Sequence, residues 1–396
     1  MKPREIRTGI YWVGAIDWNR RLVDSLTPVP EGTSYNAYLI HSDDKTVLLD
    51  TVDRRKEQVL LARLEQVPTI DYIVIHHAEL CHSGSLPAIL EKYPKATVLA
   101  TNRAGKILID HVGIRKEQIQ TVSDGETLSV GRRTLKFIHT RFVHWPETMV
   151  TYIPEEKLLF TCDLFAAHIA TSNLYAGDDY HVYQAAKRYY AEILMHYRNP
   201  MVQRVLEKLS SLSIDFIAPG HGPLYDEPTK IQEAYNDWVF SKPKNLVFLP
   251  YISMYGSTKT MVDYFIEVLL EKGVRVHALN LEEEQDLGKL AVALVDPATI
   301  VLATPTTMGG PHPYHVTLLY LISILKPKIR RLSLIGSYGW ARIINKTFGE
   351  MTAKLDIEIL DSVLSKGPPE KEDFQALDKL AAAIAKKHEE EGLKSP

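Results

Sequence analysis

A dense cluster of possible metal ligands lies in the segment His77-Ala78-Glu79-Leu80-Cys81-His82. Four side chains that can bind a metal fall within six residues, directly after the β-branched run 72–75. Three further candidates, each just after a strand-like run, are His144, Asp163 and His221. Because functional sites gather where strands end in layered α/β folds, we expect these seven side chains to form one site.

The kinds of ligand indicate a centre with two metals. A lone histidine at a strand end is more often a hydrogen-bonded structural residue than a ligand, but an ordered set of this length favours metal binding. Imidazoles and two carboxylates can fill the shells of two ions if one carboxylate bridges them, and Asp163 is the natural bridge. The oxygen donor at Glu79 favours a hard, redox-active ion such as iron. We therefore expect redox chemistry over hydrolysis.

Three loops in the last third of the chain could bind a flavin. The first, Ser253-Met254-Tyr255-Gly256-Ser257-Thr258, joins a predicted strand to a helix that begins near Lys259. A hydroxyl-rich loop at a helix N-terminus can bind a phosphate, although serine-rich turns are often only helix caps. The others are Thr304-Pro305-Thr306-Thr307 and Gly336-Ser337-Tyr338-Gly339-Trp340. Glycine and an aromatic ring suit a flat isoalloxazine, so the three loops together predict FMN.

The elements that must position these residues change character along the chain. Segments 35–41 and 46–50 predict an antiparallel hairpin, and helical stretches such as 56–66 then alternate with short strands. A long helix is expected over 184–212, followed by a strand at 214–218. After the polar stretch Ser241–Lys244, five strand candidates near residues 246, 274, 300, 332 and 357 alternate with helices. That rhythm is typical of a doubly wound parallel sheet.

Length and composition limit the number of domains, the kinds of partner and the location of the protein. A chain of 396 residues exceeds the size at which one core usually stops growing, so we expect two domains, 1–243 and 244–396. The net charge of -3, from well-mixed charges, favours neither nucleic acid nor a membrane surface as a partner. Two cysteines, with no signal peptide or membrane-spanning run, predict a cytoplasmic location.

The order of these motifs resembles that of the flavodiiron proteins over nearly the whole chain, beginning at the segment GTSYNAYL, residues 32–39. The family pattern is HxExDHSG, then HWP, a Cys-Asp or Asn-Asp pair and a late HG, followed by flavodoxin loops of the types SMYGST, TPT and GSYGW. The resemblance implies an α/β protein, with an N-terminal metallo-β-lactamase-like αββα sandwich and a C-terminal flavodoxin-like doubly wound parallel sheet.

The resemblance also implies an activity and a set of ligands. His77, Glu79, His144 and Asp163 would hold one iron, and His82, Asp163 and His221 the other. Flavodiiron proteins reduce dioxygen to water, nitric oxide to nitrous oxide, or both, and they assemble head to tail as a dimer or a dimer of dimers. The electron donor would be a separate molecule, such as rubredoxin or a reduced deazaflavin or flavin.

One position departs from the family pattern, because Cys81 stands where the family has an aspartate. The thiol could ligate the metal, leave its place to water, or mark a site for zinc or a mixed pair. Two other functions stay open at this point: a zinc-dependent hydrolase, and a flavin shuttle or redox sensor with an altered metal site. Tyr35, Trp145 and His168 are candidates for the substrate pocket, although each could be ordinary core.

Overall fold

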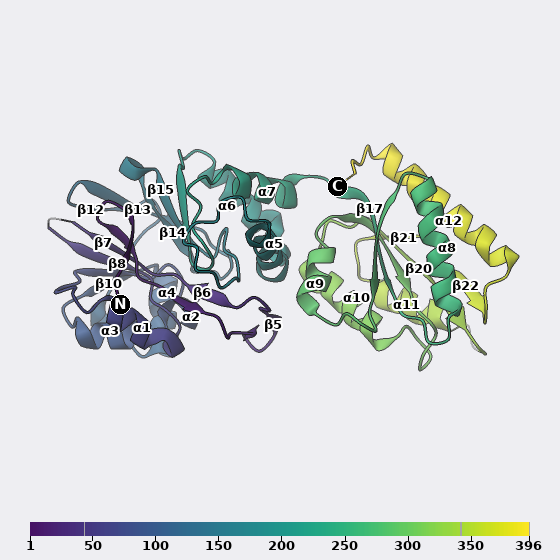
Figure 1. The fold of residues 1–396 in the computed structure, drawn as a ribbon, viewed down its shortest axis with the longest axis horizontal. Helices are drawn as coiled ribbons and strands as arrows, with labels where there is room; N and C mark the ends of the chain where they lie inside the picture. Colours follow the sequence, from purple (N-terminus) through teal and green to yellow (C-terminus); the bar gives the residue numbers. More distant parts are fainter. Residues whose placement is uncertain (43, 341–342, 396) are drawn as a thin grey trace. The chain divides into compact units, whose positions relative to one another are not determined.

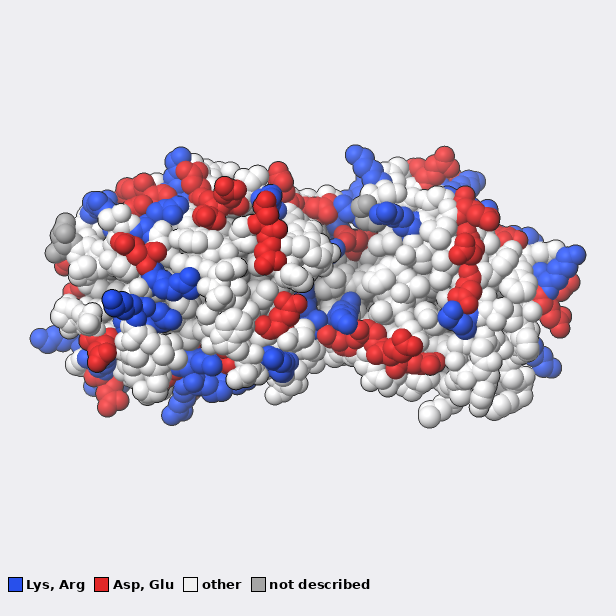
Figure 2. Space-filling model, in the orientation of Figure 1, with Lys and Arg blue, Asp and Glu red and all other residues white. Residues whose placement is uncertain are grey.

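The computed structural model describes residues 1–42, 44–340 and 343–395, which divide into two compact units between Val239 and Phe240 (Figure 1). Lys and Arg side chains are interspersed with Asp and Glu on the visible face of each unit (Figure 2). None of the helices in the described part of the chain is long and apolar enough to cross a membrane.

The first unit is built on two sheets. The larger has the order β1 (Arg4–Arg7), β2 (Ile10–Trp12), β7 (Tyr38–His41), β8 (Thr46–Leu49), β9 (Tyr72–Val74), β10 (Thr97–Ala100) and β11 (Ile119–Thr121). The other has the order β12 (Thr127–Val130), β13 (Arg133–His139), β14 (Met149–Ile153), β15 (Leu158–Cys162) and β16 (Phe216–Pro219). The pairs β3 (Ala15–Asp17) with β6 (Thr33–Tyr35) and β4 (Leu22–Val23) with β5 (Thr27–Pro28) are separate.

Successive side chains along a strand point to opposite faces of its sheet. One face of the larger sheet therefore packs against the other sheet, and its opposite face packs against helices. In β8, Val47 and Leu49 belong to the core between the two sheets, together with Phe137 and Phe160 from the other sheet. Leu48 faces the opposite way, into a core that it shares with residues of the helices. The helices are α1 (Glu57–Arg63), α2 (Leu80–Ser83), α3 (Leu86–Lys92), α4 (Asn102–Ile107), α5 (Tyr180–Tyr189), α6 (Gln203–Leu209) and α7 (Thr229–Phe240).

Short helical turns complete this unit: η1 (Arg54–Lys56), η2 (Leu108–Val112), η3 (Lys116–Gln118), η4 (Pro154–Glu156), η5 (Tyr190–Leu194), η6 (Met195–Tyr197) and η7 (Arg198–Val202). They correct one prediction. The prediction of a single helix over 184–212 is wrong, because the backbone leaves helical geometry at Asn199, with φ −122° and ψ 121°. A residue before proline is disfavoured in the helical region, and Pro200 follows directly. The predicted hairpin of β7 and β8 is confirmed.

The second unit is a parallel sheet with helices on both faces. Its strand order is β18 (Arg275–Asn280), β17 (Lys244–Tyr251), β19 (Pro297–Ala303), β20 (Arg331–Tyr338) and β21 (Glu358–Ile359), with β22 (Val363–Lys366) also paired to β20. The helices are α8 (Ser257–Glu271), α9 (Leu287–Ala293), α10 (Pro313–Leu325), α11 (Ile344–Thr352) and α12 (Lys371–Glu390). Figure 1 shows α9 and α10 on the opposite side of the sheet from α8 and α12.

This strand order is that of a flavodoxin-like fold, in which the switch point of the sheet places its ligand-binding loops at one edge. β17, β19 and β20 are neighbours. Two of the predicted flavin loops follow β17 and β19, and the third begins within the end of β20, at Gly336. The sequence predicted one strand near residue 357, whereas two short strands, β21 and β22, occupy the end of the sheet. The predicted doubly wound parallel sheet is confirmed.

Candidate metal and flavin sites

The structure brings all seven predicted metal ligands together at strand ends. His77 and Glu79 lie in the loop after β9, and the short helix α2 carries Cys81 and His82. The other three follow strands of the second sheet, namely His144 after β13, Asp163 after β15 and His221 after β16. Hydrogen bonding of the strands therefore fixes where each of these loops begins.

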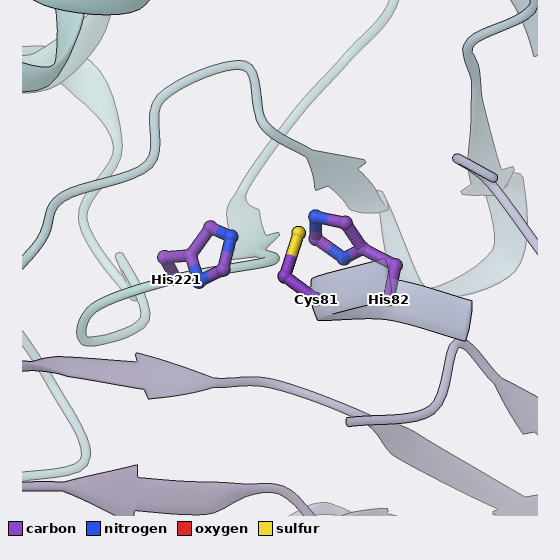
Figure 3. Close-up of side chains that lie close together, drawn as sticks. All are labelled: Cys81, His82 and His221. Atoms are coloured by element: carbon purple, nitrogen blue, oxygen red, sulfur yellow. The ribbon is translucent and has the colours of Figure 1, made fainter. Parts of the chain in front are cut away.

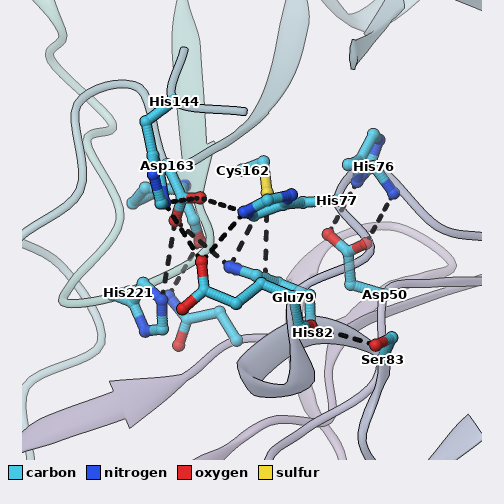
Figure 4. Close-up of polar contacts among 12 residues, drawn as sticks. Asp50, His76, His77, Glu79, His82, Ser83, His144, Cys162, Asp163 and His221 are labelled. Atoms are coloured by element: carbon cyan, nitrogen blue, oxygen red, sulfur yellow. Dashed lines mark hydrogen bonds and ion pairs between the residues drawn. The ribbon is translucent and has the colours of Figure 1, made fainter. Parts of the chain in front are cut away.

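Four of these side chains form one group, which we call the first position: His77, Glu79, His144 and Asp163. The Oε2 atom of Glu79 lies 3.0 Å from Nε2 of His77 and 3.1 Å from Nε2 of His144. Oδ2 of Asp163 is 3.4 Å from Nε2 of His144 and 3.7 Å from Nε2 of His77 (Figure 4). Two imidazoles and two carboxylates thus converge.

The second position is formed by Cys81, His82 and His221, whose ligand atoms lie within 4.8 Å of one another (Figure 3). Asp163 takes part here as well, through its other oxygen. Oδ1 is 3.1 Å from Nε2 of His82 and 3.6 Å from Nε2 of His221. Asp163 therefore presents one oxygen to each position, which is the arrangement that a bridging carboxylate needs.

The outer nitrogens of two histidines are held so that their inner nitrogens face the centre. His77 donates from Nδ1 to Oε1 of Glu147 over 2.7 Å, and His221 donates from Nδ1 to the carbonyl of Ser34 over 2.6 Å. Metal-binding histidines commonly carry such a partner, which fixes the tautomer and the orientation of the ring. The arrangement points both Nε2 atoms toward the centre, where their lone pairs could bind a metal.

Charge within the site also suits cations. Burial opposes a proton on His77, but hydrogen bonds to Glu147 and Glu79 raise the pKa of His77 to about 10. Burial likewise disfavours a charge on Asp163, yet the surrounding imidazoles hold the pKa of that carboxyl well below its usual range. Carboxylates thus stay ionised among proton-bearing rings. Metal ions can replace those protons, so the donor set fits two cations.

A cavity of about 390 Å³ opens onto both positions. All three pocket candidates from the sequence line it, namely Tyr35, Trp145 and His168. The ring centroid of Trp145 lies 4.9 Å from that of His77, and the centroid of His168 lies 5.0 Å from that of His221. The cavity is large enough for a small molecule beside the metal ligands.

Sequence reasoning missed Asn36, which holds the loop that carries His221. Its side-chain amide donates to the carbonyls of Pro219 and Gly222, each over 2.8 Å, and its oxygen accepts from Nε1 of Trp12 over 2.9 Å. The only signal was a polar residue inside an apolar strand segment. Glu147 was also missed, because no local spacing links it to His77, seventy residues away in sequence.

We expect Asn36→Ala to destabilise the fold by about 1–3 kcal/mol, because the substitution leaves several buried polar groups without partners. The second position should lose metal as the loop with His221 relaxes. Chemical denaturation and metal analysis would measure both effects. Asn173→Ala, at an exposed asparagine of the same unit, serves as the control and should change neither. Full metal content and unchanged stability in Asn36→Ala would contradict this role.

The three predicted flavin loops are linked at one edge of the second sheet. The hydroxyls of Thr258 and Ser337 lie 3.1 Å apart, and the backbone N–H of Thr306 donates to the carbonyl of Ser337 over 2.8 Å. A cavity of about 520 Å³ lies against them, lined in part by the predicted residues Met254, Thr306, Thr307, Gly339 and Trp340. Thr304 and Gly336 are buried and do not line it.

This cavity has features that suit a flavin. Among the described residues, the buried hydroxyl oxygens of Thr306 and Thr307 have no hydrogen-bond partner, so a ligand could provide one. The ring of Trp340 is 96 % exposed at the cavity. Gly256, with φ +91°, turns the chain into the first turn of α8, where free N–H groups favour a phosphate. These residues fit a flavin with a terminal phosphate.

Comparisons with known proteins identify the family. Residues 33–222 match the model of the ODP family beta lactamase. The chain is 35% identical to a nitric oxide reductase of Moorella thermoacetica, over 97% of this chain and 98% of that protein. It is 32% identical to the rubredoxin-oxygen oxidoreductase of Megalodesulfovibrio gigas, over 98% of each. A coenzyme F420H(2) oxidase of Methanothermobacter marburgensis is 30% identical, over 96% of this chain and 98% of that protein.

Solved structures agree with the sequence relatives. The rubredoxin oxygen:oxidoreductase from Desulfovibrio gigas matches with a TM-score of 0.91 at 32% identity, over 97% of this chain and 98% of that one. The flavodiiron protein from Giardia intestinalis matches with a TM-score of 0.88 at 27% identity, over 100% and 99%. The chain belongs to the flavodiiron proteins. It is an oxidoreductase of that type, and the predicted resemblance and fold are confirmed; the hydrolase alternative is not favoured.

Proposed function

We propose that this chain reduces dioxygen to water, nitric oxide to nitrous oxide, or both, with FMN passing electrons to a non-haem diiron centre. The observation that carries the proposal is the position of Asp163, whose two oxygens face two separate groups of metal ligands. The names of the relatives support both substrates, since one is a nitric oxide reductase and another a rubredoxin-oxygen oxidoreductase.

In this proposal, residues 1–243 form the diiron domain. His77, Glu79, His144 and Asp163 hold the first iron, and Cys81, His82, Asp163 and His221 hold the second. The two ions supply electrons and open coordination positions to the diatomic substrate. The chain's own residues bind the metals and enclose the substrate, with Tyr35, Trp145 and His168 as walls of the cavity. A thiolate from Cys81 makes the second position softer, so zinc is the competitor to test there.

Residues 244–396 form the proposed FMN domain. The backbone N–H groups and hydroxyls of the loop 253–258 bind the phosphate at the start of α8, where the helix dipole favours an anion. The loops 304–307 and 336–340 hold the isoalloxazine, and the hydroxyls of Thr306 and Thr307 are available to it. Trp340 provides an aromatic ring at the cavity. Because the loop 253–258 can bind a phosphate, FMN fits better than a flavin without one.

We also propose a head-to-tail homodimer, or a dimer of dimers, in which the flavin of one copy serves the metal centre of another. Exposed apolar side chains support this assembly, since Tyr255, Met308 and Trp340 are 92 %, 99 % and 96 % exposed around the flavin cavity. The proposed electron donor is a separate rubredoxin or a reduced deazaflavin or flavin. Both cysteines are free of disulfides, which supports the proposed cytoplasmic location.

The test begins with protein purified anaerobically, in which iron, zinc and flavin are measured per chain. Consumption of dioxygen and of nitric oxide by the chemically reduced protein is then followed in one electrode chamber. We expect two irons and one FMN per chain, with at least one gas consumed. Zinc in place of iron, or iron without uptake of either gas, would overturn the proposal. Comparison of the two rates identifies the preferred substrate.

A further inference from the structure

The four histidines of the metal site differ in what holds their outer nitrogen. Among the described residues, His77 is the one of these four whose Nδ1 is hydrogen-bonded to a carboxylate, at 2.7 Å from Oε1 of Glu147. His221 donates from Nδ1 to a backbone carbonyl, and the sulfur of Cys162 lies 3.8 Å from Nδ1 of His82. A carboxylate is therefore hydrogen-bonded to the outer nitrogen of one ligand of the first position. Near the second position the carboxylate of Asp50 lies within 4.8 Å of a ring nitrogen of His82, but it is hydrogen-bonded to His76.

Glu147 is itself firmly held. Its side chain is buried, and Oε1 accepts a second hydrogen bond from the backbone N–H of Ala78 over 3.2 Å. The backbone carbonyl of Glu147 accepts a hydrogen bond from the hydroxyl of Thr101 over 2.9 Å, which ties this segment to the end of β10. The carboxylate thus spans the loop of His77 and the segment that carries His144.

The other oxygen of Glu147 has a different environment. Among the described residues, Oε2 has no hydrogen-bond partner, and Glu147 lines a polar cavity of about 620 Å³. Arg103 and Arg141 also line this cavity, which shares no lining residue with the cavity above the metal ligands. Glu147 therefore connects a metal ligand to a polar space separate from the substrate side.

From this geometry we propose that Glu147 is a positioning residue for the first metal position, acting through His77. Its carboxylate fixes the Nδ1–H tautomer of His77, aims Nε2 at the metal and adds electron density to the imidazole. Because negative charge stabilises the more oxidised metal, Glu147 also lowers the reduction potential of the first position. The inference rests on the proposed two-metal function.

The test uses the full chain with Glu147→Gln and Glu147→Ala, and Glu156→Gln as the matched control. Glu156 also forms a short contact, to Arg133, at 2.8 Å, but its side chain is 23 % exposed and it is not near the metal ligands. Metal-free protein is titrated with Co²⁺ alone against a competing chelator. We expect wild type and the control to bind two ions tightly. Glu147→Gln should weaken one of the two by about 10–100-fold, and Glu147→Ala should weaken it more.

A second readout separates positioning from simple support of the fold. In the iron-loaded protein, we expect the midpoint potential of the iron in the first position to become more positive in Glu147→Gln. Thermal unfolding of the protein should change little. Two unchanged Co²⁺ affinities would overturn the inference, as would an equal loss at both positions with an unchanged potential. Because Co²⁺ binding needs neither iron nor gas turnover, these results stand apart from failure of the proposed function.

Discussion

Asp163→Asn is expected to remove most of the bound metal from this protein. Oδ1 of Asp163 lies 3.1 Å from Nε2 of His82, and Oδ2 lies 3.4 Å from Nε2 of His144, so one carboxylate serves both positions. An asparagine offers one neutral oxygen in place of two charged ones. Loss of a residue that only holds a metal ligand in place costs about 10–100-fold in metal affinity. Loss of a ligand that both positions share should lower the affinity by more than about 100-fold at each position.

Metal analysis of Asp163→Asn, purified in parallel with wild type, measures this effect, and gas consumption should fall to background with it. Asp215→Asn is the matched control, because Asp215 forms an exposed ion pair with Lys157 at 3.0 Å, with side-chain exposures of 61% and 50%. Such surface pairs contribute only about 0–1 kcal/mol. If Asp163→Asn kept two tightly bound metals, Asp163 would not be the bridge between the positions.

The second large effect is expected from Gly336→Ala in the third flavin loop. An added Cβ at Gly336 would lie 1.9 Å from the carbonyl oxygen of Thr304 and 2.9 Å from its carbonyl carbon. Both atoms belong to the backbone, so the two loops must move apart. The N–H of Thr304 bonds the carbonyl of Ile335 over 3.0 Å, and that link would be strained. Overpacking of this kind costs about 1–3 kcal/mol.

Because the same loops line the proposed flavin cavity, Gly336→Ala should also lose most of its FMN. Flavin absorbance per chain and chemical denaturation measure the two consequences. Gly349→Ala in α11 is the control, since an added Cβ there meets nothing within 4 Å. An alanine within a helix should stabilise it by up to about 1 kcal/mol. Full flavin content and unchanged unfolding in Gly336→Ala would refute a close-packed pair of loops.

Local sequence signals predicted much of this protein because they act over short distances. The hairpin of β7 and β8 and the βα rhythm after residue 244 follow from local strand and turn signals. The flavodoxin-like sheet could be predicted for that reason. The prediction of a continuous helix over 184–212 was wrong, because Pro200 disfavours helical geometry at Asn199.

The sequence by itself determined which residues could ligate metals and in which loops they lie. Strand ends, ligand types and their order were enough to select all seven candidates, Cys81 and His221 included. Only the tertiary structure decided which oxygen of Asp163 faces each position and which residues hold the ligands in place. Glu147 and Asn36 act across 70 and 183 or more residues of sequence. Contacts of that range depend on how the two sheets pack, which no local pattern records.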